Sequence, residues 1–485
     1  MDRGGDRRSY TPLQCGCSKA TAATASQGCV STPTQYNHAD GFAADYPAPR
    51  FYFDCPAGSD DRFAPRAFAV SADKPRRRVP QPSLALLALM MSIGPFGDTE
   101  YTPAMPAIAH SLHTGYGMVQ FTMTSYLIGS ALSRLGYGPA SDRFGRRPVM
   151  LVGTVILVLG ALLCVLSFNI WPLIAGRLVQ GVGACAGGVI ADAVVRDAFP
   201  ADKREGIYAR LNAAFALAPA LGPIVGIYVA SKLGWHANFG LLLALSILLL
   251  FLAWRFQPET LLDLNRHALE PRPLLRNYFE VLTTKGFAVY ALLGGLTVGV
   301  VYTALIGAPD LVYTVLKRGD IGIMIVAGAI LVAFVTGSGL CTVFSDKISD
   351  LWIFAAGLLI LVVGSVGLLM VGLTLGKQAG LTGFLIPMGV CFIGVGLIVP
   401  TATANAMAPF KHTAGTASSL LGFILTGTAA LATLIMSLLH NGSELDIPIV
   451  FLALSGAAVV LFVGYIIARG GPAATIAAFP TPQSQ

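Results

Sequence analysis

The chain has 485 residues, of which 54% are apolar and only 12% are charged. A soluble protein of this length needs a larger charged fraction to cover its surface, so the composition excludes an ordinary soluble domain. The formal net charge of +7 does not indicate a nucleic-acid partner, because much of the excess lies in the N-terminal region and in alternate loops between apolar segments.

The first 80 residues differ in composition from the rest of the chain. Residues 1–80 are rich in Ser, Thr, Pro, Ala, Asp and Arg, and they contain no sustained helical period and no apolar core of a signal peptide. We expect a disordered cytoplasmic tail, which ends in a basic cluster at 74–78. Cys15 and Cys17 have no second cysteine pair at ligand spacing, so we expect neither a metal nor another cofactor.

Twelve apolar segments follow, and each is long enough to cross the ~30 Å hydrocarbon layer of a bilayer. The class is therefore an all-α polytopic membrane protein, and the longest polar connection divides the segments into six and six. The predicted segments are 84–108, 117–139, 149–168, 171–195, 207–230, 236–255, 287–312, 319–344, 351–374, 380–408, 414–439 and 447–468.

Arginine and lysine residues are concentrated in alternate connections, which sets the topology. The second, fourth and sixth connections are basic and the first, third and eleventh are not, although Lys317 and Arg318 depart from the pattern. Both termini are therefore expected on the cytoplasmic side of the inner (plasma) membrane. The predicted parts are the tail at 1–80, an N-terminal bundle at 81–255, a cytoplasmic linker at 256–286, a C-terminal bundle at 287–470 and a cytoplasmic tail at 471–485.

The first segment contains two acids, Asp98 and Glu100. A charge at the bilayer centre costs ~3 kcal/mol or more, so a buried acid normally has a function or a partner. Arg177 in the fourth segment falls at a similar depth, because the two segments run in opposite directions at about 1.5 Å per residue. We expect Asp98, Glu100 and Arg177 to form a group that exchanges protons with water and couples this exchange to transport. The alternative is that both acids only pair with neighbouring helices.

The two acids cannot both face one cavity, because residues two apart on a helix are separated by about 200°. Asp98 shares a face with Tyr101 and Met105, a stripe suited to organic ligands, and is favoured over Glu100. Pro95 and Gly97 loosen the helix here, however, and leave the choice between the two acids open.

The connection at 138–148 reads GPASDRFGRRP, with one acid and three arginines framed by glycines. We expect Asp142 to lie near a helix N-terminus and Arg146 to pair with Asp197, forming a latch that favours the outward-facing state and breaks when the halves separate. An ordinary positive-inside anchor explains the arginines but not the acid and both glycines. The predicted cytoplasmic gate is Gly138, Asp142, Arg143, Gly145, Arg146, Arg147, Arg196 and Asp197.

In the fifth segment, small residues repeat every four positions and allow another backbone to approach closely, while two prolines fix bends. The residues singled out are Pro219, Gly222, Pro223 and Gly226. Other residues in or near the segments are candidates for lining a substrate cavity, namely Tyr101, Met105, Gln120, Tyr126, Asn212, Tyr302, Asp310 and Asn405. Asp192 is given no role.

These motifs resemble those of the major facilitator superfamily over roughly 82–470. The matching segments are the 138–148 connection, RLVQGVGA at 177–184 and APALGPIVG at 218–226, the last similar to the antiporter branch. YTPAMPAI at 101–108, VRD at 195–197 and AGTAS at 414–418 resemble the bicyclomycin/chloramphenicol-resistance (Bcr/CflA) exporters. That subfamily usually has an acid two residues before the tyrosine, where this chain has Thr99.

The resemblance implies twelve helices in two pseudo-symmetric six-helix bundles, with the first and fourth spans lining a central cavity. It also implies that the small face of the fifth span contacts the opposite half and seals the cavity against proton leak. A weak echo of Ser141-Asp142-Arg143 at Ser345-Asp346-Lys347 agrees with duplicated halves.

The expected function is proton-coupled export of small, largely apolar organic compounds by alternating access, performed by a monomer whose partners are its substrate, protons and the lipid bilayer. No phosphate-binding GxxxxGK[ST] motif is present, which disfavours ATP-driven transport. The alternatives are export of a specific metabolite, such as a siderophore, amino acid or polyamine, and uptake or uniport of a polar nutrient. An intramembrane enzyme is disfavoured because no segment clusters His, Cys and Asp residues.

Overall fold

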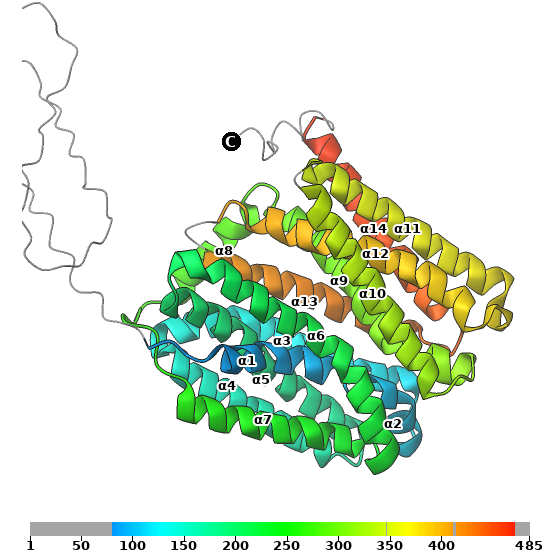
Figure 1. Ribbon diagram of the computed structural model, residues 1–485, viewed down its shortest axis with the longest axis horizontal. Coiled ribbons are helices and arrows are strands. Elements are labelled where there is room, and N and C mark those ends of the chain that lie inside the picture. The colour runs from blue at the N-terminus through cyan, green and yellow to red at the C-terminus, as the bar shows by residue number, and fades with distance from the viewer. Residues whose placement is uncertain (1–79, 346, 411–413, 471–485) are drawn as a thin grey trace, which may run out of the picture. The chain divides into compact units, whose positions relative to one another are not determined.

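A computed structural model describes residues 80–345, 347–410 and 414–470. Both predicted tails lie outside these ranges, except that Pro80 at the end of the first tail is described. Cys15, Cys17 and the basic cluster at 74–78 are therefore not described, and neither is Asp346 of the weak repeat. Throughout the described ranges the regular structure is helical, without a strand (Figure 1).

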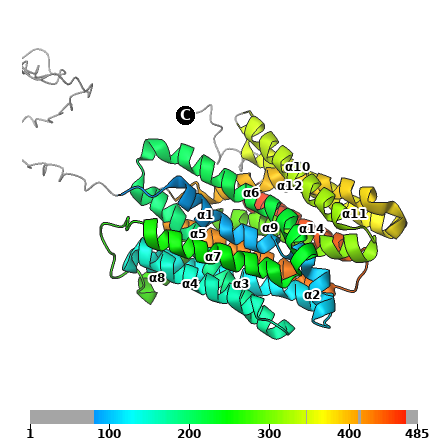
Figure 2. The same ribbon diagram turned by 60° about the horizontal axis from the view of Figure 1, so that its bottom comes forward.

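The first half begins with a helix that is broken before it reaches full length. Its elements are α1 (Leu84–Thr99), η1 (Thr102–Ala104), α2 (Met105–Ser111), α3 (Tyr116–Phe144), α4 (Arg146–Val165), α5 (Ile170–Ala198), α6 (Ala201–Leu233) and α7 (His236–Phe256). α1 lies among α5, α6 and α7 (Figure 2).

The second half has the same number of long helices. Its elements are α8 (Pro271–Thr283), α9 (Phe287–Asp310), η2 (Leu311–Val315), α10 (Asp320–Ser345), α11 (Asp350–Thr374), η3 (Gly376–Ala379), α12 (Gly380–Met407), α13 (Ala414–Leu439) and α14 (Asp446–Ala468). In the described part of the chain ten segments are long and apolar enough to cross a membrane. α3 and the broken α1–α2 segment bring the number of crossings to twelve.

The first crossing departs from the continuous helix predicted at 84–108. α1 ends at Thr99, and the chain continues through η1 before α2 begins at Met105. Pro103 and Pro106 lack the N–H groups that an unbroken helix would use at this point. The break separates Tyr101 and Met105 from the helical face of Asp98, so the predicted stripe does not form.

The linker predicted at 256–286 contains the short helix α8, which the sequence reading did not anticipate. Two prolines in its first turn suit a helix start, where their missing N–H groups need no partner. Tyr278 on α8 donates a 2.8 Å hydrogen bond to the carbonyl of Leu135 on α3. Burial, together with the negative charge of Asp142, raises the pKa of Tyr278 to about 12, so this donor stays protonated at neutral pH.

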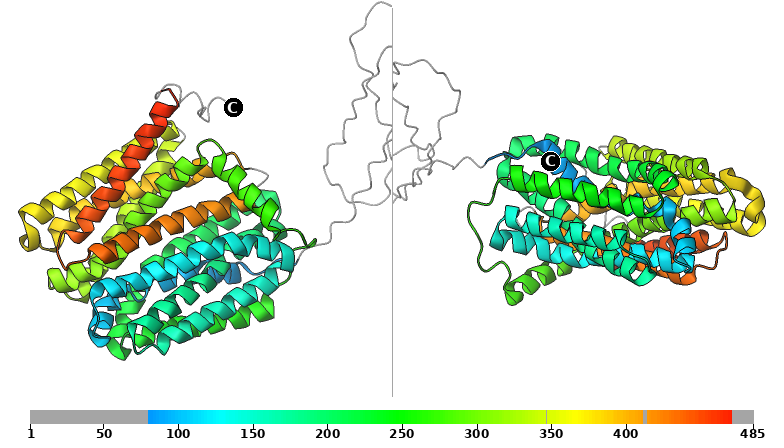
Figure 3. Two further views of the ribbon diagram at one scale, coloured as in Figure 1. Left: turned by 180° about the vertical axis from the view of Figure 1, so that it is seen from behind. Right: turned by 90° about the horizontal axis from the view of Figure 1, so that it is seen from below.

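The two halves meet mainly along α3 and α13, which run side by side in the opposite views of Figures 1 and 3. We call the end of the bundle that carries the turn between α3 and α4, at Gly145, the α3–α4 end, and the other the far end. At the far end Tyr116 and Gln120 of α3 both donate to the carbonyl of Ile306, at 2.9 and 3.2 Å. Ser437 of α13 donates to the carbonyl of Gly117 at 2.5 Å, so the halves are closed together there.

The small face of α6 has a different partner from the one expected. A Cβ atom added at Gly226 would overlap the carbonyl oxygen of Glu100, and one at Gly222 would overlap the hydroxyl of Thr99. These glycines therefore pack against α1 of the same half instead of sealing a contact with the opposite half. Close approach of two backbones is still the reason for glycine at both positions.

Candidate functional site

A cavity of about 520 Å³ lies between the halves at the α3–α4 end. Helices α3, α5 and α6 line one side of it, α13 lines the other, and Tyr278 contributes from α8. The lining is strongly charged for a space between apolar helices: it includes Arg134, Asp142, Arg146, Asp192, Arg196 and Asp197.

A smaller space of about 70 Å³ continues from this cavity toward the middle of the bundle. The two spaces share Met91, Arg134, Gly188 and Phe215 as lining residues, so they are contiguous. The smaller space reaches Asp98 on α1. A path therefore runs from the α3–α4 end to a buried carboxylate, while the far end is closed.

Asp98 is 6% exposed and is held by a residue of the other half. The hydroxyl of Tyr302 on α9 donates to its Oδ2 at 2.8 Å, and its Oδ1 is buried without a hydrogen-bond partner among the described residues. Tyr126 of α3 lines the same space. The carboxylate thus lies at the junction of the halves with one of its two oxygens unsatisfied.

Arg177 on α5 is completely buried close to Asp98 but does not form an ion pair with it. It donates to the carbonyl of Gly97 at 3.1 Å and to the side-chain oxygen of Gln180. Its guanidinium carbon lies 4.3 Å from the ring centres of both Tyr101 and Tyr126. Two aromatic faces and two oxygens stabilise the buried cation, which adds positive charge near the carboxylate without neutralising it by contact.

Glu100 lies away from the cavity, although it is equally buried. Its backbone carbonyl accepts a 3.2 Å hydrogen bond from Asn238 of α7 and faces Gly226 of α6. Neither of its carboxylate oxygens has a hydrogen-bond partner among the described residues. Of the two acids in the first crossing, Asp98 is the one that lines the path.

Three of the residues predicted to line a cavity do so. Tyr126 and Tyr302 line the inner space, and Asn212 of α6 lines the larger one. The other five lie elsewhere in this conformation. Tyr101 packs against Phe239 within the first half, with ring centres 5.4 Å apart. Asn405 donates to Asp350 at 2.9 Å within the second half. The remaining three, Met105, Gln120 and Asp310, lie toward the closed far end.

Asp310 belongs to a group of charges near the far end. His440 lies 2.9 Å from Asp446 and 3.9 Å from Asp310, and its ring packs on Tyr116 at 5.1 Å. Partial burial lowers the pKa of His440, but the interaction with Asp446 and the charge of Asp310 act against it, and the net shift is upward. The imidazole therefore joins α9, α14 and the loop between α13 and α14.

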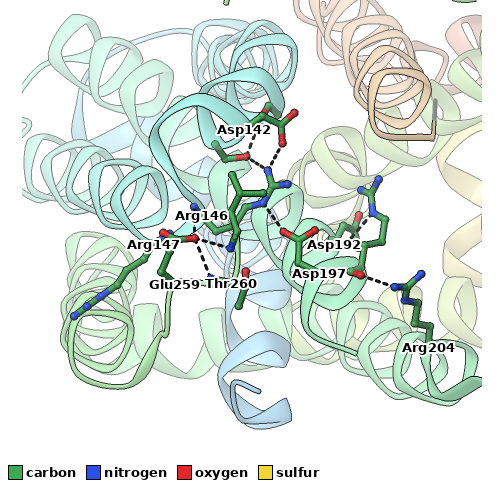
Figure 4. A network of polar contacts seen from close by, with 12 residues as sticks. Asp142, Arg146, Arg147, Asp192, Asp197, Arg204, Glu259 and Thr260 are labelled. Atoms are coloured by element: carbon green, nitrogen blue, oxygen red, sulfur yellow. Dashed lines mark hydrogen bonds and ion pairs between the residues drawn. The ribbon is translucent and has the colours of Figure 1, made fainter. Parts of the chain in front are cut away.

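The predicted gate forms a network within one half (Figure 4). Arg146 at the start of α4 donates to Asp197 of α5 at 2.8 Å and lies 2.6 Å from Asp142 of α3. The pairs are intact although the cavity at this end is present, because all three residues belong to the same half. The expectation that they break when the halves separate does not hold for this conformation.

The other predicted gate residues take different positions. Arg143 is exposed beside Phe144, while Arg147 donates to the carbonyl of Trp254 at 2.7 Å. The backbone of Gly138 faces Ser419 of α13, and Arg196 lines the cavity.

Glu259 completes the network and was not anticipated from the sequence. It follows α7, and its carboxylate accepts from the backbone N–H groups of Arg146 and Arg147 at 3.0 and 3.1 Å. A carboxylate at this position stabilises the N-terminus of α4. Gly145 has a φ of 99°, and a Cβ atom there would lie 2.5 Å from Glu259, so the turn requires glycine. The partners are more than a hundred residues apart, which is why local reading missed them.

Arg134 and Asp192 are two further lining residues that the sequence reading did not use. Each is a charged residue inside an apolar helix, which is the signal that could have identified them. Across the described ranges no group of three or more His, Cys, Asp or Glu side chains is arranged to hold a metal ion.

A family described as the Major Facilitator Superfamily matches residues 84–433. The chain belongs to the major facilitator superfamily. Its twelve-helix all-α fold is thereby confirmed, and it is a multi-pass membrane protein.

Relatives support the finer resemblance. The chain is similar to "Multidrug resistance protein D" of Escherichia coli, with 32% identity over 74% of this chain and 89% of the relative. It is 31% identical to "Chloramphenicol resistance protein" of Pseudomonas aeruginosa over 78% of this chain and 90% of that protein. It is also 30% identical to "Bicyclomycin resistance protein homolog" of Haemophilus influenzae over 78% of this chain and 93% of that protein. The resemblance to the chloramphenicol and bicyclomycin group is thus confirmed.

Solved structures of transporters share the fold. A partially occluded inward-open form of the E. coli xylose transporter XylE matches with a TM-score of 0.60 over 79% of this chain and 97% of that one. Its sequence is 14% identical, so this similarity concerns the fold alone.

Proposed function

We propose that the protein is a drug-efflux transporter that exports small organic compounds in exchange for protons. The observation that carries the proposal is the contiguous path from the α3–α4 end to Asp98, with the far end closed. The named relatives favour drugs as the exported compounds. We assign the α3–α4 end to the cytoplasm because its connection is rich in arginine, which puts both termini on the cytoplasmic side of the inner membrane and makes this conformation inward-open.

We assign the proton to Asp98. A carboxyl group that is reached from one side can exchange a proton with that side, and its charged form is costly when water is excluded. Tyr302 binds it from the second half at 2.8 Å, so a rocking movement of the halves changes the surroundings of the carboxyl group directly. Arg177 supplies a fixed positive charge nearby. Competition between a proton and a substrate for Asp98 would couple proton entry to substrate export.

In the same scheme the Arg146 network serves as a rigid part of the first half. It ties α3, α4 and α5 together, so the half moves as one body when the cavity closes at the cytoplasmic end. The far end must open by breaking the bonds that Tyr116, Gln120 and Ser437 make across the halves. The transporter works as a monomer in this scheme, since both halves come from one chain.

Proton movement driven by a drug in proteoliposomes tests the function. Chloramphenicol is added to vesicles that contain the purified chain and a pH-sensitive dye, and wild type is compared with Asp98→Asn and Glu100→Gln. We expect Asp98→Asn to abolish drug-dependent proton movement and Glu100→Gln to keep it. Equal coupling in all three proteins would refute the assignment of Asp98, and absence of any response to a panel of drugs in wild type would refute drug export.

A further inference from the structure

The proton-exchange scheme leaves two cavity arginines without a role. Arg134, near the middle of α3, lines both the larger and the smaller space and so marks the neck between them. Arg196 lies nearer the cytoplasmic end of α5 and lines the larger space. Both differ from Arg146, whose charge is matched by Asp142 and Asp197.

Arg134 reaches across the cavity toward the second half. A Cβ atom added at Gly422 of α13 would lie 2.8 Å from its Nη1 atom, so the guanidinium occupies the space that a side chain there would need. Its Nε is buried without a hydrogen-bond partner among the described residues, which include no carboxylate in ion-pair contact with it. A cation beside a cavity with unused donors is a position for an anionic ligand group.

Arg196 reaches the same helix about two turns earlier. Its Nη1 atom would lie 3.5 Å from a Cβ atom at Gly415. Its Nε donates to the backbone carbonyl of Asp192 at 3.1 Å and not to the carboxylate. The side-chain carboxylate of Asp192 interacts electrostatically with both arginines. Asp192 thus interacts with two guanidinium groups, and Arg134 also interacts electrostatically with Asp98. Among the described residues, neither Arg134 nor Arg196 is in ion-pair contact with a carboxylate.

The facing surface of α13 adds neutral donors. Thr416, Ser418 and Ser419 line the cavity between the two glycines. Hydroxyl and guanidinium groups together are the usual donors for a carboxylate, which takes two or more hydrogen bonds in a fixed geometry. On the inner side of Arg134 lies Asp98, an acceptor for a cationic group.

We propose that Arg134 and Arg196, with the hydroxyl groups of α13, form a carboxylate-binding subsite, a proposal that rests on the proposed transport function. The preferred substrates are then zwitterionic organic compounds whose carboxylate binds this subsite and whose cationic group reaches Asp98. Competition with the proton is retained, because the cationic group and the proton are alternatives at the same carboxyl group.

Two matched fluorescent dyes test the subsite. Rhodamine 110 carries a delocalised cation and a free carboxylate, and rhodamine 123 is its methyl ester, which lacks the anion. Binding of each dye to the purified full chain in phosphatidylcholine nanodiscs is measured by fluorescence polarisation, without a proton gradient. We expect wild type to bind rhodamine 110 about tenfold tighter than rhodamine 123, as charge-assisted hydrogen bonds allow.

The variants then assign the preference to its residues. Arg134→Gln should weaken rhodamine 110 about tenfold and leave rhodamine 123 unchanged, and this unchanged binding shows that the variant is folded. Arg134→Lys should keep part of the preference, because it keeps the charge. Arg272→Gln, an exposed arginine on α8, is the matched control and should bind both dyes as wild type does.

The outcomes separate the subsite from the proposed function. Equal affinity of wild type for the two dyes, or an equal loss of both in Arg134→Gln, would overturn the subsite. Loss of the preference when phosphatidylglycerol is added would assign these arginines to a lipid headgroup and also overturn it. A carboxylate preference in a protein that moves no protons in response to any drug would leave the subsite intact and refute proton-coupled export.

Discussion

The Arg146 network provides the sharpest test of how the connection between α3 and α4 works in this protein. Arg146 is 7% exposed, and its guanidinium binds Asp197 and Asp142, whose side chains are 22% and 47% exposed. Breaking a fully buried pair costs about 3–5 kcal/mol, but solvent screens Asp142 in particular. We therefore expect Arg146→Gln to lower the free energy of unfolding by about 2–3 kcal/mol.

Thermal unfolding in detergent measures this loss. A change of that size corresponds to a fall of about 5 °C in the unfolding temperature. Arg143→Gln is the matched control, because Arg143 is exposed on the same connection and should leave the unfolding temperature unchanged. A cysteine introduced at Gly415, on the cavity face of α13, reacts with a water-soluble thiol reagent only when the cavity is open. Its reaction rate therefore reports the fraction of molecules in which the cavity is open.

The two readouts distinguish a brace within one half from a latch between halves. If the network is a brace, stability falls and the reactivity of the cavity cysteine stays close to that of the parent protein. An unchanged unfolding temperature combined with a large change in cysteine reactivity would refute the reasoning. It would mean that Arg146 acts mainly across the halves, through contacts that this conformation does not contain.

Three further changes have distinct expected outcomes. Gly226→Leu should abolish the recovery of folded protein in size-exclusion chromatography, because the new side chain would overlap the backbone at the end of α1. Gly240→Leu is the control and should be tolerated, because a Cβ atom there meets nothing within 4 Å. Equal recovery of the two variants would contradict this packing. His440→Gln should lower the unfolding temperature more at pH 5.5 than at pH 9, because the pKa of His440 is higher in the folded than in the unfolded protein. The stabilisation is then complete below about pH 6.5, the unfolded pKa, and is lost as the pH rises through the folded pKa. A loss that does not depend on pH would exclude the ion pairs as its cause. Tyr302→Phe should reduce drug-driven proton movement, because it removes the hydrogen bond to Asp98. It should have little further effect on drug binding in Asp98→Ala, which has no acceptor for that bond; additive losses of binding would contradict a shared role.

The structure also suggests why the first crossing is broken beside the site. α1 ends at Thr99, just after Asp98, which lines the inner space, and the backbone carbonyl of Glu100 faces α6 and α7. A continuous helix would also separate the two side chains by about 200°, but it would have kept Tyr101 on the cavity side with Asp98. The break instead releases Tyr101 to cover the guanidinium of Arg177 at 4.3 Å.

The amino-acid sequence by itself determined the class, the number of crossings and the topology prediction. Apolar length, charge depletion and alternating basic connections are local properties, and the bilayer imposes them on each segment separately. The same logic identified Asp98, Glu100 and Arg177, since ionisable residues are costly inside any apolar segment. The same physical argument applies to Arg134, and to Asp192, to which the sequence pattern assigned no role.

Only the tertiary structure decided which charges meet. Glu259 reaches the start of α4 from beyond α7, Tyr302 reaches Asp98 from the other half, and Arg134 reaches Gly422 on α13. These contacts join residues that are more than a hundred positions apart, and nothing in the local spacing of either partner specifies the other. Helix packing brings them together, because the crossing of two helices depends on the shapes of both faces at once.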